Sequence, residues 1–237
     1  MSHSEQFSQL LSQAHFHLTT GNFELCEELL NKAEIELKKN DTTDLYFDFT
    51  MVKADMYRST GRRELCLFLW DQLLQRSEND IQRCNCYSEK ALDSLKIGQY
   101  DEVFNHANEA LKYADSYPEY NKHKAFQVIG AYYWSKKDWP NALKTYSQIA
   151  AIAEKTNNQG FVAKYHAKMA MALKRMGYIN LAVDRLYEAE EHAQLYGETT
   201  LIQNIALWRA DLFREMGEDK KALTILQRIV EIYDDHL

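Results

Sequence analysis

Apolar and polar positions along the chain follow the period of amphipathic helices, and the clearest example lies around Gly177. One helical pattern ends at Gly177, and a second amphipathic run begins at Ile179 and carries Ala182, Leu186 and Ala189. Apolar residues at this spacing fall on one face of a helix. The segment therefore predicts two amphipathic helices joined by a tight turn.

The same pattern occurs six times, which predicts six helical hairpins. The turns are separated by 40, 37, 39, 40 and 40 residues, a period typical of helical repeat arrays. The expected repeats cover approximately 4–40, 44–77, 80–116, 120–156, 160–196 and 199–236, within one domain spanning 1–237. The aligned turn positions are Gly21, Gly61, Gly98, Lys137, Gly177 and Gly217.

Glycine permits the backbone geometry that ends a helix. The fourth turn has no glycine, and Pro140 is expected there in the first turn of the following helix, where its missing N–H costs little.

Two further alignment columns hold only small or compact residues. Two antiparallel helices approach closely where one of them offers little side-chain bulk, so the small residue of one helix admits a large residue of the other. Seven residues before each turn lie Ala14, Ala54, Ala91, Gly130, Ala170 and Ala210. Five residues after it lie Cys26, Cys66, Val103, Ala142, Ala182 and Ala222.

Composition supports an all-α fold. Apolar residues make up 46% of the 237 positions, and only 2 prolines and 8 glycines occur, which favours helices with short turns. The net charge of −7 argues against broad affinity for nucleic acid. Neither a signal peptide nor a membrane-spanning run is recognisable. We therefore expect a cytoplasmic protein that binds no nucleic acid and no membrane.

The order of small residue, turn glycine, aromatic and small residue resembles the tetratricopeptide repeat. The first and fifth repeats carry it most clearly, as Ala14, Gly21, Phe23, Cys26, Leu30 and Ala33, and as Ala170, Gly177, Ile179, Ala182, Leu186 and Ala189. The resemblance covers nearly the whole chain and implies a right-handed superhelical array of about six hairpins. The long period is similar to that of bacterial signal-transduction and peptide-pheromone regulators.

The column that usually holds a large aromatic early in the first helix departs from this family pattern. Its members are Leu10, Thr50, Tyr87, Phe126, His166 and Ala206.

No motif for catalysis or for a cofactor is present. Cys84 and Cys86 point in different directions on a helix, and no second Cys/His pair stands at ligand spacing. Cys26 and Cys66 occupy a small-residue column, which favours structural thiols. No phosphate-binding loop or nucleophile elbow occurs. The sequence predicts a protein without enzymatic activity, metal or cofactor.

Partner-binding residues are expected on the first helix of each hairpin, which lines the concave face of such arrays. This face is predicted to be acidic in the second and third repeats, at Asp48, Asp55 and Glu89, and basic with aromatic residues further on. That chemistry suits an acidic or C-terminal peptide segment, although the same lysines can form a solvated face. The candidates are Lys124, Trp134, Lys164, Lys168, Met171, Lys174, Asn204, Trp208, Asp211 and Arg214.

Two apolar surfaces suggest further protein contacts. Phe68 lies on a helix that is apolar nearly all round, so either the curvature of the array or a partner is expected to cover it. No polar capping helix follows the last predicted helix, which leaves Ile225, Ile229 and Ile232 as a possible interface. This helix is expected to form a homodimer or to dock on a partner.

Three functions are consistent with these patterns. The first is an interaction module or scaffold that binds a peptide or partner segment in its groove, in a regulatory or assembly role. The second is a peptide-sensing regulator that acts on a separate effector and belongs to a signalling system. The third and least favoured is an enzyme with a site inside the superhelix.

Overall fold

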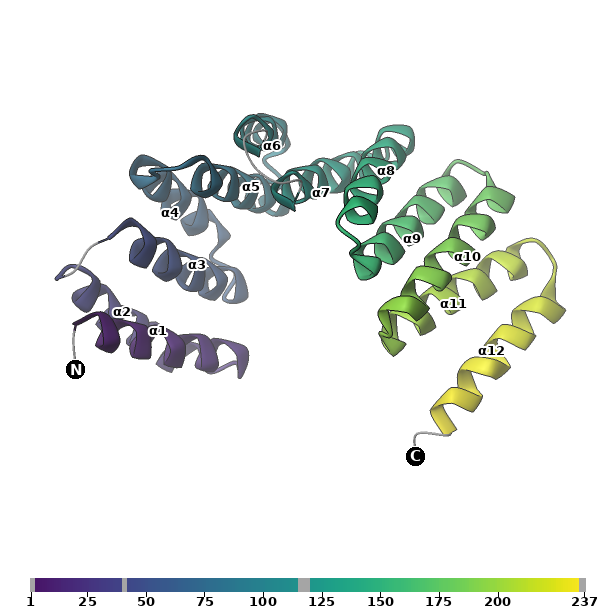
Figure 1. Cartoon of the computed structure of the whole chain (residues 1–237), viewed down its shortest axis with the longest axis horizontal. Coiled ribbons are helices and arrows are strands. Elements are labelled where there is room, and N and C mark those ends of the chain that lie inside the picture. The colour runs from purple at the N-terminus through teal and green to yellow at the C-terminus, as the bar shows by residue number, and fades with distance from the viewer. Residues whose placement is uncertain (1–2, 40–41, 115–119, 235–237) are drawn as a thin grey trace. The chain divides into compact units, whose positions relative to one another are not determined.

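A computed structural model describes residues 3–39, 42–114 and 120–234, with side chains left undescribed at 120–121 and 231–234 (Figure 1). The described residues form twelve helices and no strand. The predicted all-α array of helical hairpins is confirmed. The helices are α1 His3–Thr19, α2 Phe23–Leu37, α3 Thr43–Ser59, α4 Arg63–Arg76, α5 Asp80–Ile97, α6 Tyr100–Ala114, α7 Tyr120–Ser135, α8 Trp139–Lys155, α9 Gln159–Arg175, α10 Ile179–Tyr196, α11 Thr199–Glu215 and α12 Asp219–Asp234.

All six aligned turn positions adopt a left-handed backbone conformation. Gly177 has φ +83°, and the N–H groups of Gly177 and Tyr178 donate to the carbonyls of Lys174 and Leu173 at 3.0 Å each. These bonds satisfy carbonyls at the end of α9, as in a Schellman motif. The other five turn positions have φ between +58° and +84°. The six turn positions aligned from the sequence therefore share one backbone geometry.

The fourth turn reaches this geometry without glycine. Lys137 has φ +58°, a conformation that an L-residue adopts at a cost. Asp138 caps α8, since its side chain accepts a hydrogen bond from the backbone N–H of Asn141 at 3.3 Å. Pro140 lies in the first turn of α8, as predicted.

Both small-residue columns are buried at the contact between the paired helices. Gly130 shows why bulk is excluded. A Cβ atom built there would lie 2.5 Å from Cε1 of Tyr146, whose hydroxyl donates to the carbonyl of Gly130 at 3.3 Å. The large ring of α8 therefore needs the missing side chain on α7.

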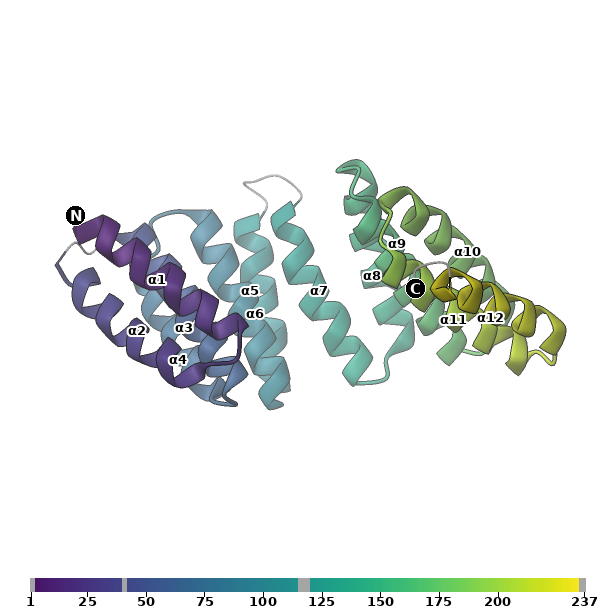
Figure 2. The same cartoon turned by 90° about the horizontal axis from the view of Figure 1, so that it is seen from below.

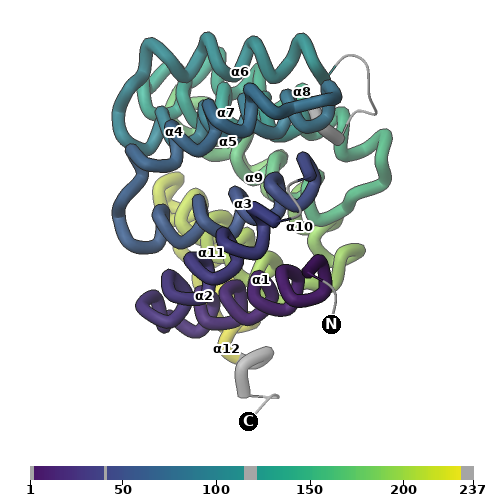
Figure 3. The backbone as a smooth tube through the Cα atoms, turned by 90° about the vertical axis from the view of Figure 1, so that its left-hand side faces the viewer, coloured from purple at the N-terminus to yellow at the C-terminus, as the bar shows by residue number. Residues whose placement is uncertain are grey.

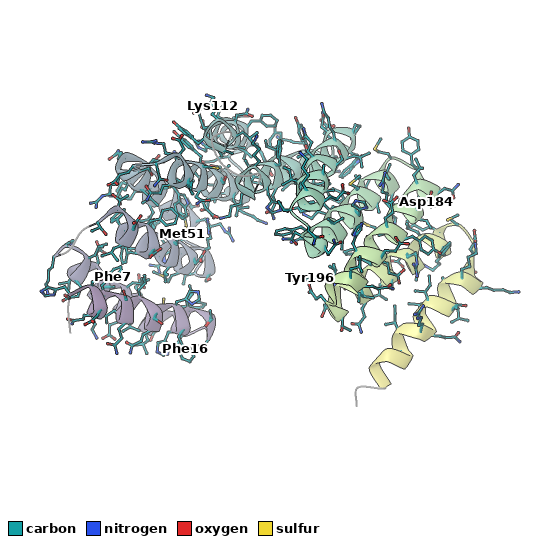
Figure 4. The ribbon with its side chains drawn as sticks, viewed as in Figure 1. Phe7, Phe16, Met51, Lys112, Asp184 and Tyr196 are labelled. Carbon is teal, nitrogen blue, oxygen red and sulfur yellow. The ribbon has the colours of Figure 1, made fainter. Side chains whose placement is uncertain are left out.

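The helices group into two compact units, Met1–Val128 and Ile129–Leu237, with the boundary inside α7. In the first unit, α1 and α3 pack against each other (Figure 3). Phe7 of α1 is buried in the core, and the half-buried Met51 of α3 packs against the adjacent apolar cluster (Figure 4). The core of the second unit is formed by α9, α10 and α11, with α12 packed on α11 (Figures 1 and 2). The arrangement of both units as one superhelical domain stays a prediction.

No helix in the described part of the chain is both long and apolar enough to cross a membrane.

Candidate functional site

A pocket on the second unit is lined by the first turns and the middle of both α9 and α11 and by the end of α10. We call it the α9–α11 pocket. Its volume is about 430 Å³, within the range of pockets that bind small ligands or peptide side chains. Its lining residues are Asn158, Gly160, Phe161, Lys164, Ala167, Lys168, Tyr196, Glu198, Leu201 and Trp208. Three of the residues predicted from the sequence, Lys164, Lys168 and Trp208, therefore lie in one pocket.

Lys168 is the distinctive cation of this pocket. Its ammonium nitrogen lies 5.3 Å from the ring centre of Tyr146 and 5.4 Å from that of Tyr165, which holds the cation through the faces of two rings. Burial lowers the pKa of Lys168, and the positive charge of Lys164 lowers it further. Within the described residues, neither lysine has a carboxylate at ion-pair distance. The two lysines thus leave positive charge unneutralised in a partly apolar pocket.

The two tyrosines stay neutral in this setting. Burial raises the pKa of Tyr146 to about 12 and raises that of Tyr165 further. The phenol groups therefore supply ring faces and no charge at neutral pH. An anionic group entering the pocket would meet the lysine charge without competition from a phenolate.

Two helix N-termini add to the positive potential. Gly160 and Phe161 belong to the first turn of α9, and Leu201 belongs to that of α11. The free N–H groups of a first helical turn carry partial positive charge that favours anions. Asn158 caps α9 by accepting from the N–H of Phe161 at 3.1 Å. Glu198 is the one carboxylate among the lining residues, so the pocket keeps a net positive charge.

Tyr196 forms an exposed aromatic wall. Its side chain extends from the end of α10 (Figure 4) and is 55% exposed. A Cβ atom built on Gly160 would lie 2.9 Å from Cε1 of Tyr196, so the missing side chain of Gly160 lets this ring close the pocket. The repeat columns did not predict Tyr196 and Glu198, because Tyr196 is the last residue of α10 and Glu198 is the N-cap of α11, and neither position belongs to a column.

The other predicted groove residues of the second unit lie outside the pocket. Trp134 packs edge-on against Trp139, with ring centres 4.9 Å apart, and Met171 packs against the core. Lys174 pairs with Glu215 at 2.6 Å. The remaining three are exposed, and two of them pair with each other; they are Asn204, Asp211 and Arg214.

The predicted acidic face of the first unit is largely neutralised by Arg58. Asp93 is fully buried and accepts from Arg58 at 2.8 and 2.9 Å and from the indole N–H of Trp70 at 2.8 Å. Arg58 also lies 2.6 Å from Glu89 and 3.0 Å from Asp55. This Asp93 network joins α3, α4 and α5.

The network also sets the ionisation of Arg58. Burial alone would lower the pKa of Arg58, but hydrogen bonds to Asp93 and the charges of Glu89 and Asp93 raise it above its usual value. The guanidinium stays charged. Lys124, a predicted partner-binding residue, is drawn into the same set through an ion pair with Glu89 at 3.2 Å. These charges connect α3, α5 and α7 within the first unit.

The two predicted interfaces differ from expectation in detail. Phe68 is 62% exposed, so the curvature of the array does not cover it. On α12, Ile229 is buried and Ile225 half-buried, while the side chain of Ile232 lies outside the described residues. The exposed apolar stripe of α12 consists of Leu223, Leu226 and Val230. The interfaces themselves stay predictions.

The four cysteines are buried, and burial raises the pKa of each thiol. They are therefore protonated at neutral pH and poorly nucleophilic. Within the described residues, no three His, Cys, Asp or Glu side chains gather so as to hold a metal ion.

Comparison with known proteins places the chain among helical repeat proteins. A family model described as Tetratricopeptide repeat matches residues 206–236. No curated protein matches the sequence. The apo form of RapI is similar in structure, with a TM-score of 0.71, 14% identity, and coverage of 97% of this chain and 77% of that chain. Aspartyl phosphate phosphatase F from Bacillus subtilis gives a TM-score of 0.76, 13% identity and coverage of 96% and 70%.

A signal-transduction ATPase with a tetratricopeptide repeat sensor, from Pyrococcus horikoshii, gives a TM-score of 0.79 and 15% identity. This chain is covered completely in that comparison but spans 39% of the ATPase. The resemblance to tetratricopeptide repeats read from the sequence is confirmed, and the fold is similar to that of RapI.

Proposed function

We propose that this chain, a tetratricopeptide-like repeat protein, is an interaction module that binds a carboxylate-bearing segment of a partner protein in the α9–α11 pocket. The fold supports a scaffold for protein interaction. The observation that carries the finer proposal is Lys168, a partly buried lysine between two tyrosine rings without a carboxylate partner among the described residues.

A buried cation without a partner is costly to the folded state. A partner carboxylate would offset this cost by pairing with Lys168, and a charge-assisted hydrogen bond of this kind is strong in a pocket of low dielectric. Trp208 and Tyr196 would bury the apolar part of the same segment at a low cost in side-chain entropy. Specificity then comes from an acidic group placed next to an apolar one.

The proposal includes a cytoplasmic location and no catalytic activity. Repeat arrays of this type generally serve as scaffolds. The chemistry of the pocket, with ammonium groups and aromatic rings, suits recognition of a charged segment.

Paired substitutions on α9 test the site. Partners are captured on the immobilised wild-type protein and quantified by mass spectrometry. The double substitution Lys164→Gln with Lys168→Met should abolish capture of the dominant partner, because it removes both positive charges from the pocket. The matched control is Lys174→Gln, which changes a lysine of the same helix that already pairs with Glu215. Unchanged helicity in circular dichroism excludes unfolding, and capture that survives the double substitution would place the functional surface elsewhere.

A second candidate is a peptide-sensing regulator acting on a separate effector. It is favoured by the likeness in fold to RapI. The two candidates differ in occupant, because a sensor binds a short free peptide whereas a scaffold binds a segment of a folded partner. A small secreted-peptide precursor encoded next to this gene would favour the sensor.

A further inference from the structure

A second pocket lies between α10, α11 and α12, and we call it the Ala206 pocket. It has a volume of about 240 Å³. Its apolar walls come from Ile202, Ala206, Ile225 and Ile229. An apolar cavity of about 150 Å³ is already large enough to bind benzene, so this pocket has room for a single ring and a substituent.

The repeat register explains why this space is empty. Ala206 stands eleven residues before its turn at Gly217, the position that His166 holds before Gly177. His166 is buried there, and its ring meets that of His192 at a centroid distance of 5.6 Å.

In the third hairpin the same position is Tyr87, which stacks on Tyr113 at a centroid distance of 5.8 Å and an interplanar angle of 5°. Two of the other hairpins thus place a planar ring in contact with a second ring at this position. The alanine of the last hairpin leaves that volume unfilled.

The charge around this position differs between the fifth hairpin, with His166, and the sixth, with Ala206. Nδ1 of His166 lies 2.9 Å from Glu188, and Nε2 lies 3.5 Å from Glu154. The register places Arg228 where the previous hairpin has Glu188, and Gln194 where it has Glu154. Both residues line the Ala206 pocket. A site that flanks a basic ring with carboxylates in one hairpin therefore offers a guanidinium and an amide in the next.

Arg228 is the available charge of this pocket. Arg209 and Glu190 also line it, but they pair with each other, so their charges offset. The guanidinium of Arg209 also stacks over Tyr187, 4.4 Å from the ring centre. Arg228 is exposed and has no ion-pair partner among the described residues. A free guanidinium binds a carboxylate through two parallel hydrogen bonds.

We propose that the Ala206 pocket binds a flat apolar ring that carries a carboxylate. The ring occupies the space left by Ala206 between the isoleucine side chains, and the carboxylate pairs with Arg228. The site is separate from the α9–α11 pocket and does not depend on it. The ligand is either a small aromatic acid or the free C-terminal residue of a peptide that ends in phenylalanine, which share this chemistry.

Calorimetric titration with phenylacetate and with its neutral isostere phenylacetamide tests the site on the full chain. Phenylacetate should bind saturably, and the amide at least tenfold more weakly. Ala206→Phe should abolish binding, because the phenylalanine ring would fill the space that the ligand ring occupies. Arg228→Gln, a surface change that leaves the core intact, should remove the preference for the acid. Arg214→Gln removes an arginine of the same unit that lies outside the pocket and should leave binding unchanged.

A third titrant, the tripeptide Ala-Ala-Phe with a free carboxylate, separates the two sources of the ligand. Tighter binding than phenylacetate assigns the site to a chain terminus, and weaker binding assigns it to a small molecule. Absence of saturable binding of all three compounds at millimolar concentration would overturn the proposal. Equal affinity for acid and amide, or binding that persists in Ala206→Phe, would overturn it as well.

Discussion

At the scale of single residues, Lys137 shows how the repeat tolerates an exception. Glycine fills the aligned turn position in the other five hairpins, and Lys137 adopts the same left-handed conformation with φ +58°. That conformation costs an L-residue roughly 1–2 kcal/mol, which glycine avoids. Glycine in turn loses more backbone entropy on folding, which offsets part of this advantage. The fourth turn is thus a strained copy of a common geometry.

Lys137→Gly should therefore raise the free energy of unfolding by about 0.5–1 kcal/mol. Urea denaturation followed by circular dichroism measures the change. Lys136→Gly is the matched control, since it replaces the neighbouring lysine, which has no left-handed backbone, and should lower stability. Equal effects of the two substitutions would mean that the turn carries no strain.

His166 gives the molecule a dependence on pH. Burial lowers its pKa, and Arg185 and His192 act in the same direction, while Glu188 and Glu154 raise it. A histidine whose pKa is lowered in the folded state binds fewer protons there than in the unfolded chain. The contribution of His166 to the free energy of unfolding therefore falls as the pH drops below about 6.5, the pKa of histidine in the unfolded chain.

His166→Phe should remove this part of the acid sensitivity, because phenylalanine fills the same space without titrating. The free energy of unfolding of the wild type, relative to the variant, should be lower at pH 5.5 than at pH 7.5. Urea titrations at both values measure the difference, and carboxylates common to both proteins cancel to first order. A difference that is the same at both pH values would mean that His166 does not titrate in this range.

At the scale of elements, the Asp93 network links α3, α4 and α5 through hydrogen bonds. Asp93→Ala leaves the guanidinium of Arg58 buried with its main partner removed, which should cost about 3–5 kcal/mol. Asp71→Ala is the control, since Asp71 forms an exposed ion pair with Lys90 at 2.6 Å worth about 1 kcal/mol or less. Chemical denaturation compares the two, and a small loss in Asp93→Ala would show that the network is not a main support of this unit.

The sequence predicted the hairpins and their register, but it did not predict this network. Periodicity locates Gly177 and Ala170 because both are set by contacts within one hairpin. Arg58 and Asp93 are 35 residues apart, and only the packing of neighbouring hairpins brings them together. Residues such as Asp55 and Glu89 were therefore predicted to be free acidic groups in a groove.

The candidate site was predicted in part for the same reason. Lys164, Lys168 and Trp208 lie on the first helices of two neighbouring hairpins, α9 and α11, at positions that the repeat register identifies. Tyr196 is the last residue of α10, next to the connection between hairpins, where no column constrains the residue type. Its packing on Gly160 depends on where the end of α10 lies relative to the start of α9. Periodic positions are readable from sequence, whereas pocket walls contributed by connections are not.

At the scale of the whole molecule, exposed apolar surface on α12 predicts self-association. Leu223 and Val230 are 56% and 57% exposed and lie on one side of the helix with Leu226. An exposed apolar stripe of this kind is a common protein-contact surface. Light scattering should show a dimer that Leu223→Lys with Val230→Lys converts to a monomer. Leu195→Lys, at an exposed leucine of α10, is the control, and a wild-type monomer would contradict the prediction.

The central claim is that Lys168 binds a carboxylate of the partner segment. A double-mutant cycle on the captured segment tests this claim most directly. Calorimetry gives the affinity of the segment and of a copy with its carboxylate replaced by an amide, for the wild type and for Lys168→Met. We predict a coupling energy of at least about 1 kcal/mol between the lysine and the carboxylate. Additive effects, with a coupling energy near zero, would contradict the proposed function of the pocket.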